Sequence, residues 1–202
     1  MPAQRLLWLR RLSLLCVGMT ILLMALGAWV KANGAGLACP DWPQCYGEWF
    51  PPFPSQENGR LYAGEPVAFT QAQVLYEWGH RAVVSLLLVP LVAFAIVALR
   101  TPDAHPIVRR LPLAAVGLYF GQAALGAVTV ITGNPAWATT AHLVLATVLL
   151  TTLVVAASAV HFRPLGDPKP APPEPPKPRV VSYVYQDGAV QAPAPGSEGP
   201  DG

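Results

Sequence analysis

The chain has 202 residues, of which 53% are apolar and only 12% carry a charge. Soluble domains carry about 25% charged residues, so this composition excludes an ordinary soluble globular protein. A formal net charge of +2 is too small to indicate a nucleic-acid partner, and three cysteines are too few for a scaffold built on disulfides. The sequence therefore predicts a small membrane protein.

Four apolar segments are long enough to span a bilayer as helices, which takes about 20 residues each. They cover residues 12–30, 75–99, 111–132 and 136–160. A cleaved signal peptide is the alternative for the first segment, but its length favours a retained helix. We expect an all-α, four-helix transmembrane bundle over residues 1–162, with a long outer loop after the first helix.

The distribution of basic residues predicts the orientation in the membrane. Arginines precede the first segment and lie between the second and third, whereas the loop 31–74 has two basic residues against four acidic ones. By the positive-inside rule both termini are expected in the cytoplasm, as in a multi-pass plasma-membrane protein. Three tryptophans then fall at the outer ends of their helices, where aromatic residues are enriched: Trp29, Trp78 and Trp137.

The last part of the chain has a different composition. Residues 163–202 hold 11 of the 23 prolines, five glycines and few large apolar side chains. Such a segment buries too little surface to offset the entropy of ordering, which predicts a disordered cytoplasmic tail.

Two histidines lie inside predicted membrane helices, His80 in the second and His142 in the fourth. Both helices run inward from the outer face, and each histidine lies at a depth of roughly 8–9 Å, given a rise of about 1.5 Å per residue. Ionisable residues inside a membrane are costly, so each is a functional hypothesis. Two imidazoles at one depth are placed to ligate one metal from opposite sides. The alternative is that each makes an interhelical hydrogen bond.

Haem iron is the metal that two histidines suit best. A zinc site needs three or four ligands, and besides Glu77 no other ligand type lies at this depth. A porphyrin supplies the remaining ligands itself, and histidine is a common axial ligand. We therefore expect His80 and His142 as axial ligands of haem iron, with Arg81 as a cation for the propionates.

Two further polar side chains are candidates for the same site. Glu77 lies one helical turn before His80 and is spaced i,i+4 with Arg81. It is either a proton-handling carboxylate at the mouth of a haem pocket or one half of an interfacial salt bridge. Gln122, deep in the third helix, is expected to bond either a haem edge or a neighbouring helix.

The outer loop contains Cys39 and Cys45, separated by five residues that include two prolines. In an oxidising compartment this pair can close a disulfide. Its role is either that of a structural link in a long loop or that of a redox-active pair. Cys16, in the first helix, is interpreted as a small core residue.

Together these motifs resemble the haem A synthase family. The stretch 30–37 and the cysteine loop are similar to that family's first outer loop, and Glu77-Trp78-Gly79-His80-Arg81 resembles its E-x-x-H-R helix start. The residues Gly121-Gln122 and Ala141-His142-Leu143 resemble its third and fourth helices. The resemblance covers about residues 12–160.

This resemblance implies oxidation of a ring methyl of haem O to a formyl group, which gives haem A for a terminal oxidase. It implies His80 and His142 as the axial pair, with haem b or substrate haem O as the bound group, and Glu77 as the essential carboxylate. Family members usually have eight helices in two halves, and this chain resembles the N-terminal, substrate-side half. We therefore expect a homodimer or a partner half, and contacts with haem O synthase and the terminal oxidase.

Two other classes of function remain open from the sequence. A non-catalytic haem b carrier or electron-transfer cytochrome needs the same two axial histidines. A membrane thiol–disulfide oxidoreductase suits four helices with an outer cysteine pair. Such enzymes generally relay electrons between two cysteine pairs, however, and this chain has one pair plus Cys16.

Overall fold

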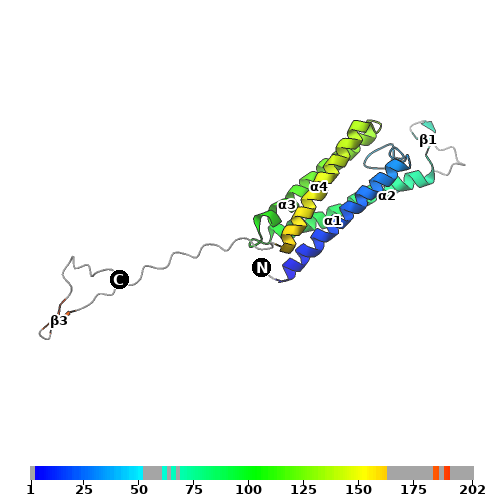
Figure 1. Ribbon diagram of the computed structural model, residues 1–202. Coiled ribbons are helices and arrows are strands. Elements are labelled where there is room, and N and C mark those ends of the chain that lie inside the picture. Colours follow the sequence, from blue (N-terminus) through cyan, green and yellow to red (C-terminus); the bar gives the residue numbers. More distant parts are fainter. Residues whose placement is uncertain are drawn as a thin grey trace. The chain divides into compact units, whose positions relative to one another are not determined.

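The computed structural model describes residues 3–51, 61–62, 65–66, 69–162, 184–186 and 189–191. The chain divides into two compact units, Met1–Asp167 and Pro168–Gly202. The first unit contains four long helices (Figure 1), which are α1 (Ala3–Ala32), α2 (Gln71–Leu99), α3 (Pro106–Ile131) and α4 (Ala136–Phe162). Each helix is long and apolar enough to cross a membrane. The predicted all-α, multi-pass membrane fold is therefore confirmed.

The helices extend beyond most of the predicted apolar segments because helical hydrogen bonding does not stop where charge begins. At its start α1 continues through the basic N-terminal residues as far as Ala3. Before α2, Thr70 forms a capping box with Gln73, which satisfies free backbone groups of the first turn. The start of α3 has Pro106 just after the N-cap residue His105, whose ring accepts a hydrogen bond from the backbone of Ile107.

The four helices form a ring in which α1 packs against α2 and α4, and α3 packs against α2 and α4. We call the end where α1 begins the inner end, and the end where α1 stops the outer end. In Figure 1 the α1–α2 pair and the α3–α4 pair lie close together near the inner end and diverge toward the outer end.

The buried side chains form two clusters, one shared by all four helices and one at the outer end. One core cluster takes residues from all four helices, with Leu9, Phe94, Val108 and Leu153 fully buried. Cys16 belongs to this cluster, which confirms its interpretation as a core residue. A second, smaller cluster lies at the outer end and takes its buried residues from α1, the following loop and α2.

Two of the three predicted interfacial tryptophans are strongly exposed at the outer end, Trp29 by 54% and Trp137 by 61%. Trp78 is half-buried, because its indole N–H donates to the backbone oxygen of Trp49 and its ring contacts Phe50. Two of these side chains therefore suit a membrane interface, and the third fastens the outer loop to α2.

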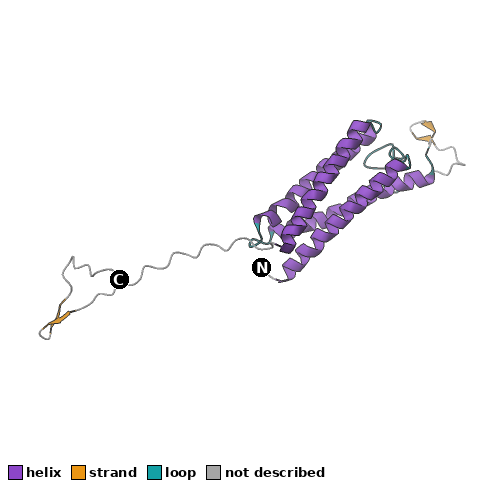
Figure 2. Ribbon diagram, viewed as in Figure 1, coloured by secondary structure: helices purple, strands orange, loops and turns teal. Residues whose placement is uncertain are grey.

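The strands are short and are drawn in orange in Figure 2. In the outer loop β1 (Leu61–Tyr62) pairs antiparallel with β2 (Glu65–Pro66). In the second unit β3 (Val184–Gln186) pairs antiparallel with β4 (Ala189–Gln191). Most of the tail predicted to be disordered, residues 163–202, lies outside the described residues.

Candidate functional site

The structure brings the two predicted histidines near each other on the outer side of the shared core. His80 comes from α2 and His142 from α4, and the two imidazoles lie close enough for their charges to interact. Each ring packs against a glycine of the preceding helix. A Cβ atom placed on Gly27 of α1 would lie 3.3 Å from Cε1 of His80, and one placed on Gly126 of α3 would lie 3.1 Å from Cε1 of His142.

The histidines lie on the outer side of the core that all four helices share. Val83 and Val84 follow His80 along α2 and already pack against that core. The hydroxyl of Tyr119 on α3 donates to the backbone oxygen of Val84 at 3.0 Å, which ties α2 to α3 at this level. The site therefore begins where the continuous apolar core ends and the two helix pairs diverge.

Three buried polar atoms at this site have no hydrogen-bond partner among the described residues. They are Nδ1 of His80, Nδ1 of His142 and Oε1 of Gln122. Leaving a buried donor or acceptor unpaired costs about 1–3 kcal/mol, so such atoms are uncommon and point to an interaction outside the chain. Their presence on the outer side of the shared core makes this a candidate ligand site.

Gln122 contacts the neighbouring helix, one of the two interactions expected from the sequence. Its amide nitrogen lies 3.2 Å from Nε2 of His142 and donates to the backbone oxygen of His142 at 3.0 Å. The two imidazoles therefore differ, since neither ring nitrogen of His80 makes a hydrogen bond within the described part of the chain.

Glu77 and Arg81 hold the outer loop onto α2. They form an ion pair of 2.6 Å in which their side chains are 6% and 14% exposed. Arg81 also donates to three backbone oxygens of the loop, those of Cys39, Asp41 and Gln44, at 2.6–2.9 Å. The second oxygen of Glu77 accepts the backbone N–H of Cys39 at 2.9 Å. We call this arrangement the loop clamp.

The loop clamp occupies most of the donors that Arg81 offers. A guanidinium has five N–H groups, and the four on its two terminal nitrogens match the four acceptors of the clamp. The sequence predicted a propionate partner at this position, whereas the contacts of Arg81 in the structure are to Glu77 and the loop.

The cysteine loop is closed by the predicted disulfide between Cys39 and Cys45. Asp41 stabilises its turn, because its carboxylate accepts the backbone N–H groups of Tyr46 and Gly47 at 2.7 and 2.8 Å. Both of these residues have positive φ angles. Sequence reasoning missed the role of Asp41, although an aspartate in a proline-containing loop is a known turn signal.

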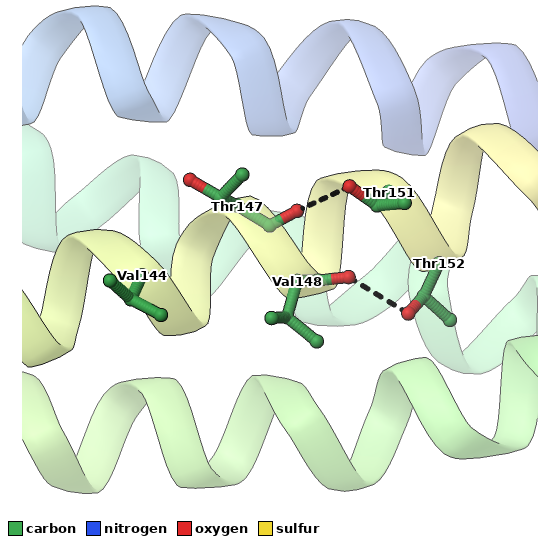
Figure 3. A pocket seen from close by; sticks show the side chains of 5 residues that line it. All are labelled: Val144, Thr147, Val148, Thr151 and Thr152. Carbon is green, nitrogen blue, oxygen red and sulfur yellow. Dashed lines mark hydrogen bonds between the residues drawn. The ribbon is translucent and has the colours of Figure 1, made fainter.

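The chain also has a groove of about 350 Å³ on the face of α4 away from the core. Figure 3 shows its lining, in which the hydroxyls of Thr151 and Thr152 donate to the backbone oxygens of Thr147 and Val148. With these hydroxyls satisfied inside the helix, the groove is suited to an apolar neighbour such as lipid. It holds none of the predicted site residues.

Two imidazoles from opposing helix pairs suit the axial positions of a porphyrin iron. Among the described residues, no group of three or more His, Cys, Asp or Glu side chains is placed to hold a metal ion. A site with two protein ligands fits haem, because the porphyrin completes the coordination of its own iron.

Comparison with known proteins gives a consistent family. A "Protoheme IX farnesyltransferase" of Halobacterium salinarum is 33% identical over 72% of this chain and 29% of its own length. A "Heme A synthase" of Shewanella oneidensis is 34% identical over 62% of this chain and 37% of its own length. A "Heme A synthase" of Methylobacterium radiotolerans is 33% identical over 83% of this chain and 44% of its own length.

The chain thus spans less than half the length of each of these relatives. No solved structure matches it significantly. The family model described as "Cytochrome oxidase assembly protein" (COX15-CtaA) matches residues 4–185, which is most of the chain. The chain therefore belongs to the COX15-CtaA family of cytochrome oxidase assembly proteins, the family of the haem A synthases.

Proposed function

We propose that this chain binds haem between His80 and His142 and takes part in haem A biosynthesis by oxidising a ring methyl of haem O to a formyl group. The observation that carries the proposal is the pair of neighbouring, partly buried imidazoles, one from α2 and one from α4, on the outer side of the shared core. Membership of the COX15-CtaA family and similarity to proteins named "Heme A synthase" support this choice over a haem carrier.

In this proposal His80 and His142 would hold the haem iron. Haem O supplies the methyl group, which would become a formyl group with an oxygen atom from water and the release of four protons, while four electrons pass to an electron acceptor outside this chain. Nδ1 of His80 has no hydrogen-bond partner among the described residues. His142 is bonded at Nε2 and at its backbone oxygen by Gln122, so its Nε2 atom becomes available to iron only when the first of these bonds breaks.

Glu77 is proposed as the carboxylate that handles protons released by the oxidation. It lies on α2 one turn before His80, at the outer edge of the site. Its two oxygens bond to Arg81 and to the backbone of Cys39, so the same residue links the haem site to the disulfide loop. We assign the disulfide a structural role, since the loop clamp uses the backbone of the loop and not its sulfur atoms.

The proposal extends to the surroundings of the chain. The outer end, with the cysteine loop, faces the outside of the plasma membrane, and the inner end, with most of the arginines, faces the cytoplasm. We further propose a homodimer or a partner half as the source of any second haem site. Haem O synthase and the terminal oxidase are the expected functional neighbours.

The test is to identify the pigment that copurifies with the protein. The protein is expressed with and without a haem O source, purified in detergent, and its haem is extracted for chromatography and mass analysis. We expect haem A or its hydroxylated precursor only when haem O is supplied. Glu77→Gln should retain haem but lose the oxidised product. Haem b alone, unchanged when haem O is present, would favour the carrier function, and no haem at all would contradict the site.

Replacing Gln122 by leucine should strengthen haem binding about threefold. Interhelical hydrogen bonds in membranes are worth about 0.6 kcal/mol on average, and the bond to Nε2 of His142 must break before that nitrogen can bind iron. Haem titration of the purified apoprotein measures the effect. Tyr119→Phe is the matched control, because it removes another interhelical bond of α3 that does not contact a histidine. A weaker affinity for Gln122→Leu than for this control would show that Gln122 assists ligation.

A further inference from the structure

Each histidine of the site is backed by a glycine at a corresponding place in the fold. Gly27 lies five residues before Ala32, the last residue of α1, and Gly126 lies five residues before Ile131, the last residue of α3. Both helices run toward the outer end, and each is followed in the chain by the helix that carries the histidine. The two helix pairs therefore repeat one arrangement, a glycine facing an imidazole.

A Cβ atom at either glycine would lie closer to the imidazole than ordinary van der Waals contact, so the ring would have to shift by a few tenths of an ångström. Non-bonded carbon atoms prefer a separation of about 3.5–4.0 Å. A Cβ atom at Gly126 would come within 3.1 Å of the His142 ring, and one at Gly27 within 3.3 Å of the His80 ring. At either position the added atom would push the imidazole away from the helix behind it.

The other glycines in the four helices have no such contact. A Cβ atom at Gly121 would meet a leucine side chain at an ordinary 3.7 Å. At Gly18, Gly79 and Gly117 it would meet nothing within 4 Å. Glycine lowers helix stability by about 1 kcal/mol relative to alanine, so helix formation does not favour it at any of these positions. Gly27 and Gly126 differ from the others because a side chain there would press on a histidine ring.

We propose that Gly27 and Gly126 are positioning residues that fix the orientation of the two imidazoles toward one haem. This inference rests on the proposed haem site and adds two residues to it. With no side chain behind it, each ring lies directly against the backbone of the preceding helix. That contact sets the direction of the ring nitrogens and the angle between the two ring planes. Gln122 limits the movement of His142 from the other side.

The test compares alanine variants within one helix. Gly126→Ala is paired with Gly117→Ala in α3, and Gly27→Ala with Gly18→Ala in α1, so each pair gains the same helix propensity. Ferric haem bound to each purified protein is examined by electron paramagnetic resonance, and affinity is measured by titration. We expect a shifted low-spin signal and about a tenfold loss of haem affinity in Gly126→Ala and Gly27→Ala. Both controls should keep the wild-type signal and affinity.

The outcomes separate this inference from the proposed function. If wild-type protein binds haem with two histidine ligands and all four variants have the same spectrum, the glycines do not position the rings and the haem site stands. If wild-type protein shows no such haem, the proposed site itself fails. Should Gly126→Ala not fold, the double variant Gly126→Ala, His142→Ala removes the ring that the methyl group meets. Recovery of folding supports the contact, and continued misfolding overturns it.

Discussion

Replacing His80 or His142 by alanine should abolish six-coordinate haem binding. Each substitution removes one proposed axial ligand, and even partners outside the first coordination shell cost about 10–100-fold in metal affinity. We expect a loss of at least about 100-fold in haem affinity and conversion of any residual haem to a five-coordinate form. Optical and electron paramagnetic resonance spectra of the purified variants measure both changes.

The chain offers a matched control for these variants in His161→Ala. His161 lies in the last turn of α4, and its Nδ1 atom is 2.8 Å from the backbone oxygen of Ala157. It is therefore a histidine of the same helix as His142 that lies at the inner end, away from the site. This variant should bind haem as the wild type does. A six-coordinate low-spin spectrum that survives in His142→Ala would exclude that residue as a ligand.

Replacing Arg81 by alanine should release the cysteine loop from α2 and destabilise the protein. The substitution removes four hydrogen bonds and leaves the Glu77 carboxylate buried beside the backbone of Cys39. Breaking a buried ion pair by removal of one partner costs about 3–5 kcal/mol. We expect a lower thermal unfolding temperature in detergent and faster reduction of the Cys39–Cys45 disulfide by an added thiol.

Two further variants test whether the loss of stability in Arg81→Ala comes from the loop clamp. Arg81→Lys keeps the charge but presents three donors without the planar geometry of a guanidinium, so it should restore only part of the lost stability. Arg5→Ala removes an exposed arginine that donates to a single backbone oxygen, that of Arg100, and should change stability little. Equal unfolding temperatures for Arg81→Ala and Arg5→Ala would show that the clamp contributes nothing to stability.

The loop clamp also affects how variants of Glu77 are interpreted. Loss of activity in Glu77→Gln could come from a lost proton acceptor or from a displaced loop, because Glu77 bonds both Arg81 and Cys39. Thiol accessibility of the disulfide distinguishes these causes. If Glu77→Gln loses activity while its disulfide stays as protected as in the wild type, the carboxylate acts on the reaction and not only on the loop.

Several features of this protein could be predicted from the sequence because they depend on local patterns. The four membrane helices follow from the length of each apolar segment, and the disulfide follows from two cysteines six positions apart in a proline-containing loop. The placement of His80 and His142 at a similar level follows from the direction and length of the helices, since both lie near the outer ends of α2 and α4. The helix spans, the disulfide and the level of each histidine can be predicted without knowing which helices pack against each other.

Other features depended on contacts between residues far apart in the chain, and only the tertiary structure decided them. Arg81 is about 40 residues from the loop that it holds, and its spacing to Glu77 gave no sign of this role. Gly27 and Gly126 are indistinguishable in the sequence from the other helix glycines, and their contact with a histidine exists only because α1 packs on α2 and α3 on α4. Hydropathy therefore determined which segments cross the membrane, and spacing indicated which residues are candidates for the site. Helix packing determined how those residues are held, because the side chains of one helix fit into the grooves of another only once the two helices are packed together.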